Sequence, residues 1–284
     1  MHFTKMHGIG NDFVMVNCLG KDGDALLTEV QRRAVFLCDR KFGVGGDGVI
    51  ALLPGQKAPF AMRMFNPDGS EAEMCGNGIR CFAKFLYDRG LTRGETHLPV
   101  ETGAGLLHLE IQAGPDGKAA TIRVDMGEPV LIPSQVPTTL GAGDSPVISL
   151  PLDLPNGLTL NVTAVSMGNP HAVTFVDNVK NYPLETVGPL VEHHPAFPRR
   201  TNTEFIQVVS DREIIFRVWE RGAAETLACG TGACAAVVAC VLNGQTGRRV
   251  LVHLPGGDLD IEWSEADNHV YMTGAAAEVF EGEI

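Results

Sequence analysis

The segment EMCGNGIRC, residues 73–81, places Cys75 directly before Gly-Asn-Gly, at what the pattern predicts is a helix N-terminus. The arrangement returns in LACGTGACA, residues 227–235, where Cys229 precedes Gly-Thr-Gly. Glycine beside a helix start lets the backbone approach a ligand closely. The first amides of a helix lack partners within the helix and attract anions. Each segment therefore predicts a binding position for a carboxylate, with a thiol at its edge.

The two segments belong to a longer internal repeat. With an offset of 154 residues, RMFNPDGSEAEMCGNG from Arg63 lies over RVWERGAAETLACGTG from Arg217, and Arg, Glu, Cys and two Gly coincide. A second pair, GIGNDFV at 8–14 and SMGNPHAV at 166–173, lies upstream in each half. Because the matches keep their order, the sequence predicts a duplicated chain of two related lobes.

Strand patterns dominate both halves. Short apolar runs with alternating or β-branched residues are separated by Gly, Pro, Asp and Asn, which predicts strands joined by short turns and largely antiparallel sheets. Helix patterns are confined to 28–39, with Thr28 as the expected N-cap, and to segments near 76–89 and 230–243. We expect an α+β fold of two pseudo-symmetric lobes, each a mostly antiparallel sheet or barrel around a central helix, with the active site in the cleft between them.

Composition excludes several classes of protein. The 284 residues carry a formal net charge of -12 and no basic stripe, which argues against nucleic acid as a partner. The longest apolar run, residues 233–242, is far shorter than the roughly 20 residues that span a bilayer, so we expect no membrane association. The N-terminus shows no signal-peptide pattern, and the seven cysteines form no framework, so we expect reduced thiols in the cytoplasm.

Two equivalent thiols suit one class of reaction. A single base returns a proton to the face it left, whereas inversion of an α-carbon requires one thiolate and one thiol on opposite faces. The helix N-terminus is expected to lower the cysteine pKa, and its amides would stabilise the carbanion. The spacings Cys75-x5-Cys81 and Cys229-x4-Cys234 do not match zinc-binding pairs, so we expect no metal. An isolated cysteine is usually a small buried hydrophobe, which is how we interpret the other five.

The chain also resembles the diaminopimelate epimerase family over essentially its whole length. The segments that carry the resemblance are KMHGIGNDFV, FNPDGSEAEMCGNGIRC, AVSMGNPH, FPRRTNTEF, ERGAAETLACGTGACA, LPGGDLDIEW and YMTGAAAEVF. The resemblance implies an isomerase that interconverts LL- and meso-2,6-diaminopimelate in lysine biosynthesis and peptidoglycan precursor supply. It also implies that the enzyme uses no pyridoxal phosphate, other cofactor or metal, and that it forms a homodimer. By the same resemblance, residues 1–127 form one lobe completed by strand 275–284, and residues 128–274 form the other.

The resemblance assigns roles to individual residues. Cys75 and Cys229 are the two acid/base groups. The substrate-binding positions are Asn11, Asn66, Gly76, Asn77, Asn169, Asn202, Glu220, Arg221, Gly230 and Thr231. His171 and Glu220 are expected to modulate the cysteine pKa values, and Phe280 is the expected dimer contact. Some family members carry glutamine at the position of Gly48, where this chain has no side chain.

The residue chemistry agrees with an amino-acid substrate. Arg221 can clasp a carboxylate and Glu220 can take an ammonium group, although solvated surface positions are the usual fate of such residues. A proline racemase-like enzyme would share the two thiols but have little use for this pair. A thiol redox or binding protein would instead work through a Cys75–Cys229 disulfide, and oxidation would then not abolish its function.

Overall fold

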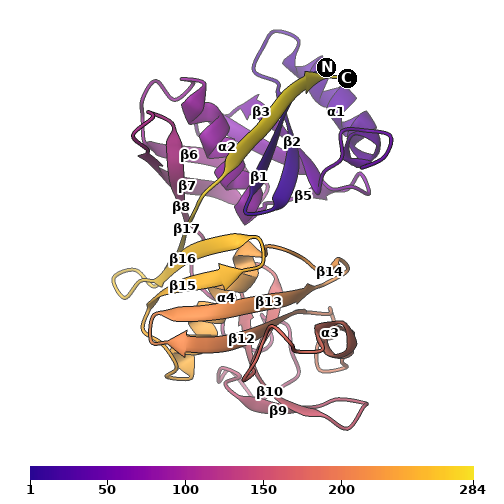
Figure 1. Cartoon of the computed structure of the whole chain (residues 1–284), viewed down its shortest axis with the longest axis vertical. Coiled ribbons are helices and arrows are strands. Elements are labelled where there is room, and N and C mark those ends of the chain that lie inside the picture. Colours follow the sequence, from indigo (N-terminus) through magenta and orange to yellow (C-terminus); the bar gives the residue numbers. More distant parts are fainter. The chain divides into compact units, whose positions relative to one another are not determined.

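The computed structural model describes residues 1–284, and the chain divides into two compact units. The N-terminal lobe comprises Met1–Asp125 and Thr273–Ile284, and the C-terminal lobe comprises Met126–Met272 (Figure 1). The lobe boundaries expected from the sequence, after residues 127 and 274, remain predictions. None of the four helices is long and apolar enough to cross a membrane.

The N-terminal lobe is a curved mixed sheet. Its elements are β1 (His2–Gly8), β2 (Asn11–Asn17), α1 (Gly23–Cys38), β3 (Gly48–Pro54), β4 (Phe60–Phe65), β5 (Glu71–Ala72), α2 (Gly76–Asp88), β6 (His97–Thr102), β7 (Gly105–Ala113), β8 (Ala119–Asp125) and β18 (Ala277–Glu283). The strands pair in the order β18, β1, β2, β3, β4, β6, β7, β8, with β5 a short addition to β4. Pairing is antiparallel except between β2 and β3 and between β4 and β6.

Helix α2 lies at the centre of this lobe. It contacts β1, β2, β3, β7, β8 and β18, so strands surround it on several sides. Its residues from Gly76 to Ala83 are all buried, as is expected for a helix enclosed by a sheet. Cys75, which precedes the first residue of the helix, therefore lies at one end of a buried central element of the lobe.

The C-terminal lobe repeats this plan. Its elements are β9 (Leu150–Asp153), β10 (Thr159–Ser166), β11 (Pro170–Phe175), α3 (Leu184–Glu192), β12 (Asn202–Ser210), β13 (Glu213–Glu220), β14 (Ala224–Glu225), α4 (Gly230–Leu242), β15 (Arg249–Leu254) and β16 (Gly257–Trp263). Strand β17 (Val270–Gly274) spans the boundary between the two units. Strands β9, β10, β11, β12, β13, β15 and β16 pair in that order, with parallel pairs at β11–β12 and β13–β15. Helix α4 is buried on all sides and contacts β10, β11, β12, β15 and β16.

Strand register confirms the internal repeat in three dimensions. In the N-terminal lobe Phe13 of β2 pairs with Gly48 of β3, and in the C-terminal lobe His171 of β11 pairs with Asn202 of β12, both in parallel. Each pair precedes a helix that begins after a cysteine. The expected α+β fold of two pseudo-symmetric lobes with mostly antiparallel sheets and one central helix each is thus confirmed.

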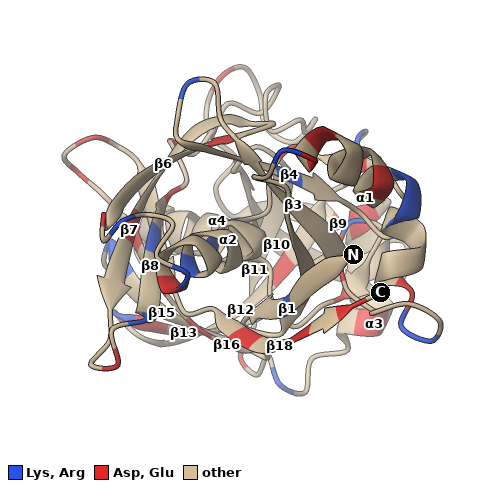
Figure 2. Ribbon diagram, turned by 90° about the horizontal axis from the view of Figure 1, so that it is seen from above, with Lys and Arg blue, Asp and Glu red and all other residues tan.

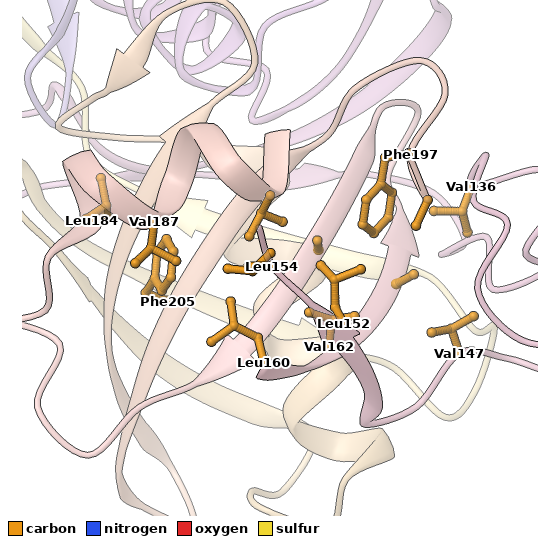
Figure 3. Packing of buried hydrophobic residues seen from close by; sticks show 14 of the residues in the cluster. Val136, Val147, Leu152, Leu154, Leu160, Val162, Leu184, Val187, Phe197 and Phe205 are labelled. Carbon is orange, nitrogen blue, oxygen red and sulfur yellow. The ribbon is translucent and has the colours of Figure 1, made fainter. Parts of the chain in front are cut away.

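A hydrophobic core in the C-terminal lobe fixes α3 against the sheet. Figure 3 shows Leu184 and Val187 of α3 close to Phe205 of β12, with Leu160 and Val162 of β10 among the neighbouring side chains. All five are nine-tenths or more buried. Helix α3 therefore contributes directly to the lobe's stability.

Two helices differ from the expectation. Helix α1 begins at Gly23, five residues before the expected N-cap Thr28, whose hydroxyl instead donates to the Asp24 carbonyl oxygen at 2.9 Å inside the helix. The Gly-Lys-Asp-Gly turn at residues 20–23 sets the start of this helix instead. Helix α3 was not expected at all, because Gly188 and Pro189 interrupt its pattern.

The chain termini meet in the N-terminal lobe. The Met1 ammonium donates to the Ile284 carbonyl oxygen at 2.8 Å, and β18 lies antiparallel to β1 (Figure 1). Strand β18 is acidic, as Figure 2 shows, and Arg89 at the end of α2 forms ion pairs with Glu278 and Glu281. The last strand is therefore tied to the lobe by charge as well as by its backbone.

Candidate active site

Cys75 is the N-cap of α2. Its backbone is extended, with φ -141°, and its Sγ accepts the Gly78 amide at 3.4 Å. A Cβ at Gly78 would lie 2.8 Å from Ile50 Cδ1, so glycine lets the helix begin this close to β3 without displacing that side chain. The expected thiol at the start of a helix is present, with Gly76 and Asn77 as the first helical residues.

Polar groups connect this thiol to the rest of the N-terminal lobe. The Asn11 Oδ1 lies 3.7 Å from the Cys75 Sγ and accepts the Asn77 Nδ2 at 3.1 Å. The Asn11 Nδ2 donates to Asp47 Oδ2 at 2.7 Å, and the buried Arg80 donates to Asn77 Oδ1 at 2.9 Å. The structure thus brings Asn11, Asn77 and Cys75 together, and adds Asp47 and Arg80, which the sequence did not single out.

Asn66 lies in the turn that follows β4. Its backbone amide donates to the Ser70 carbonyl oxygen at 2.8 Å, and its Nδ2 donates to the Ser70 hydroxyl at 3.0 Å. Gly48 is buried nearby in the sheet, where a Cβ would meet Met64 Cε at 2.8 Å and the Phe65 carbonyl oxygen at 3.1 Å. This packing leaves little room for a side chain at position 48.

Cys229 is the N-cap of α4 and is only 5 % exposed. Its Sγ lies 3.7 Å from the Thr231 hydroxyl. Burial raises the pKa of the Cys229 thiol well above its usual value, and the carboxylates of Glu220 and Glu204 raise it further. The expectation that the helix N-terminus would lower this pKa is therefore wrong for Cys229, because burial and the two carboxylates outweigh the hydrogen bonds from the Thr231 hydroxyl and the Gly232 amide.

The polar residues expected on β12 and β13 form a second cluster. Asn202 is buried, and its Oδ1 accepts the Arg221 amide at 2.8 Å while its Nδ2 donates to the Pro170 carbonyl oxygen at 3.0 Å. The Arg221 guanidinium is exposed and donates to the Arg199 carbonyl oxygen at 3.1 Å. Glu220 accepts a hydrogen bond from the Thr226 hydroxyl. The cluster holds the Glu220–Arg221 turn in a defined position.

His171 is completely buried between two partners. Its Nδ1 lies 2.7 Å from Glu204 Oε1, and its Nε2 lies 2.9 Å from Asn169 Oδ1. Sequence reasoning selected His171 and Asn169 but missed Glu204. The signal that could have found it is that Glu204 is the one charged residue of β12.

Phe280 lies on β18, away from both cysteine motifs in the sequence. Its ring meets Phe3 edge to face at 5.9 Å between centroids and is 47 % exposed. No group of three or more His, Cys, Asp and Glu side chains in residues 1–284 is arranged to hold a metal ion, and all seven cysteines are free thiols.

Solved structures of other proteins share the fold of this chain. A probable proline racemase from Agrobacterium radiobacter aligns with a TM-score of 0.72 and 16% identity, covering 100% of this chain and 92% of that one. A phenazine biosynthesis protein of the PhzF family from Bacillus anthracis aligns with a TM-score of 0.71 and 20% identity, covering 100% and 98%. The chain thus has the two-lobed α+β fold of these proteins.

Sequence similarity is much closer to one family. The sequence model for diaminopimelate epimerase matches residues 3–132 and 163–279. Diaminopimelate epimerase from Moorella thermoacetica is 56% identical over 283 residues, covering 100% of this chain and 99% of the relative. The chain belongs to the diaminopimelate epimerase family and is an isomerase of lysine biosynthesis.

Proposed function

We propose that this chain interconverts LL- and meso-2,6-diaminopimelate by moving an α-proton between two cysteines, Cys75 and Cys229. The observation that carries the mechanism is that each cysteine is the N-cap of an equivalent buried helix. One thiolate would remove the proton from one face of the α-carbon, and the other thiol would supply a proton to the opposite face. Catalysis of this kind needs no further redox or group-transfer step.

The helix N-termini would bind the reacting carboxylate. The first backbone amides of α2 and α4, at Gly76, Asn77, Gly230 and Thr231, point along the axis of helices whose dipoles favour an anion at this end. The same amides would stabilise negative charge that moves from the α-carbon onto the carboxylate in the transition state.

The remaining polar residues would recognise the two ends of the amino acid. Arg221 would bind the distal carboxylate and Glu220 the distal ammonium group, with Asn11, Asn66, Asn169 and Asn202 supplying neutral donors and acceptors. The hydrogen bonds of Asn202 to the Arg221 amide and to Pro170 support this role, since they hold the turn that carries the charged pair.

The surroundings of Cys229 would set its protonation state at rest. Burial and the nearby carboxylates favour a thiol rather than a thiolate at Cys229 before substrate binds. A bound substrate brings an ammonium group, whose positive charge would offset these carboxylates and make proton removal by Cys229 easier. His171 would act indirectly, through Glu204 and Asn169.

We further propose that the enzyme works as a homodimer in the cytoplasm. Val279 and Phe280 of β18 are 56 % and 47 % exposed, so the last strand carries exposed apolar surface. A second copy of the chain is the partner that would cover it.

The first experiment is deuterium exchange in D2O with LL-diaminopimelate, followed by NMR at the α-carbon. The wild-type protein should form meso product labelled with deuterium, and Cys75→Ala and Cys229→Ala should each lower turnover by several orders of magnitude. Cys81→Ala and Cys240→Ala are matched controls, since both thiols are buried in the same two helices but lie beyond the first helical turn. Deuterium incorporation that survives both active-site substitutions would refute the two-thiol mechanism.

A further inference from the structure

An ionisable pair is buried beneath the first turn of α4. Glu204 and His171 are both 0 % exposed, and Glu204 Oε1 lies 2.7 Å from His171 Nδ1. The other carboxyl oxygen, Oε2, is buried with no hydrogen-bond partner. A Cβ at Gly232 would lie 2.8 Å from Glu204 Oε1 and 3.1 Å from the Cys229 Sγ, so the pair lies next to the thiol.

The internal repeat shows that the fold does not need this pair. The register equates His171 with Phe13 and Glu204 with Ile50. A Cβ at Gly78 would meet Ile50 Cδ1 at 2.8 Å, the same separation that Gly232 shows to Glu204 Oε1. An apolar couple therefore fills this space in the N-terminal lobe. Since burying ionisable groups is costly where apolar ones fit, their retention in the C-terminal lobe needs a chemical explanation.

Hydrogen-bond chemistry fixes the number of protons on the pair. With the Asn169 amide oxygen as the atom 2.9 Å from His171 Nε2, the ring nitrogen is the donor of this hydrogen bond and carries a proton. The contact between Nδ1 and Glu204 Oε1 then requires one further proton, on the ring or on the carboxyl group. The pair is neutral as a whole, which suits a site closed to solvent.

The surroundings favour this neutral state. Burial raises the pKa of Glu204, which the imidazole of His171 partly opposes. The other titratable groups that act on the site are Glu220 at the end of β13, which raises the Glu204 pKa, and the Cys229 thiol on α4. An additional negative charge on Glu204 would therefore be opposed by desolvation and by Glu220.

We propose that Glu204 is a positioning residue which, together with His171, retains one shared proton and thereby holds the Asn169 amide with its NH2 group available to the substrate. The inference rests on the proposed function, in which Asn169 binds diaminopimelate. Loss of that proton would leave Nδ1–H bound to the carboxylate and turn Nε2 into an acceptor. The Asn169 amide would then have to rotate by half a turn and present its oxygen instead.

Two substitutions separate this role from packing. Glu204→Gln keeps a hydrogen-bond donor beside Nδ1, so Nε2–H and the Asn169 orientation should persist, with KM within about threefold of wild type. Glu204→Ile reproduces the apolar residue of the N-terminal lobe and leaves the ring without that partner. We expect KM to rise roughly tenfold, the effect of one lost hydrogen bond, with a smaller change in kcat. Equal KM values in both variants would overturn the proposal.

A second measurement does not depend on turnover. The protein is labelled with 15N-histidine, and the NMR signals of the His171 ring are identified by their absence in His171→Phe. Phenylalanine is chosen because Phe13 occupies the equivalent position in the N-terminal lobe. We expect a protonated Nε2 from pH 6 to pH 9, both in the wild-type chain and in Glu204→Gln. A bare Nε2 with a protonated Nδ1 in the wild-type chain would refute the proposal, even if the protein proved to act on another substrate.

Discussion

At the scale of single residues, the two cysteines could be predicted because the repeat and the glycines mark them in the sequence. Glu204 and Asp47 could not, because their partners His171 and Asn11 lie 33 and 36 residues away. Such contacts depend on the register of neighbouring strands, which a single sequence does not specify. The direction in which the Cys229 pKa shifts could not be predicted either, because it depends on burial of the thiol, which is a property of the tertiary structure.

The raised pKa of Cys229 makes a prediction for its reactivity. Only the thiolate is alkylated, so a raised pKa means slow reaction at neutral pH and a rate that increases into the alkaline range. Glu220→Gln removes one of the charges that raise this pKa, and should move the profile down by about one pH unit. The measurement is alkylation of the Cys229 peptide by iodoacetamide, followed by mass spectrometry between pH 7 and pH 11.

The control for that experiment is Glu225→Gln. Glu225 lies on the short strand β14 and pairs with Arg217 of β13 at 2.7 Å. The carboxylates that raise the Cys229 pKa are instead those of Glu220 and Glu204. The profile of Glu225→Gln should match that of the wild-type protein. A shift of equal size in the two variants would mean that net charge, rather than the local carboxylate, controls the thiol.

At the scale of elements, the sequence predicted the two central helices to within a residue or two but missed α3. The missed helix has nine residues, including Gly188 and Pro189, and its reason for existing is tertiary. Its last residue, Glu192, accepts the Trp219 indole N–H at 2.7 Å and the Gly222 amide at 3.0 Å. The helix therefore supports both ends of the turn that carries Glu220 and Arg221.

Gly188→Ala tests this support. Intrinsic helix propensity alone would favour alanine by about 1 kcal/mol. However, a Cβ at position 188 would lie 2.4 Å from Trp219 Cγ and 2.6 Å from its Cβ, so the helix must move away from β13. We expect overpacking to win and lower the free energy of unfolding by about 1–3 kcal/mol, measured by urea denaturation.

Gly247→Ala provides the comparison within the same lobe. Its nearest contact would be the Asp211 carbonyl oxygen at 3.6 Å, an ordinary van der Waals distance. A change within about 0.5 kcal/mol is expected there. If Gly188→Ala proved as harmless as this variant, the close packing of α3 on Trp219 would not be needed for stability.

At the scale of the whole molecule, duplication explains why so much could be read from one sequence. Two copies of each signal, in the same order, predicted the strand-rich lobes and their central helices. The differences between the copies were not predictable in the same way. Phe13 and Ile50 in one lobe became His171 and Glu204 in the other, and only the shared register reveals that these residues occupy equivalent positions.

The proposed homodimer gives the last prediction. Phe280 packs its edge against Phe3 yet keeps 47 % of its surface exposed, beside the more exposed Val279. Phe280→Glu should convert a dimer into a monomer at micromolar concentrations, because it places a charge in an apolar contact. Phe42→Glu is the matched control, since Phe42 is 78 % exposed in the N-terminal lobe and lies on a different segment. Sedimentation analysis showing a monomeric wild-type chain, or an unchanged dimer in Phe280→Glu, would count against β18 as the interface.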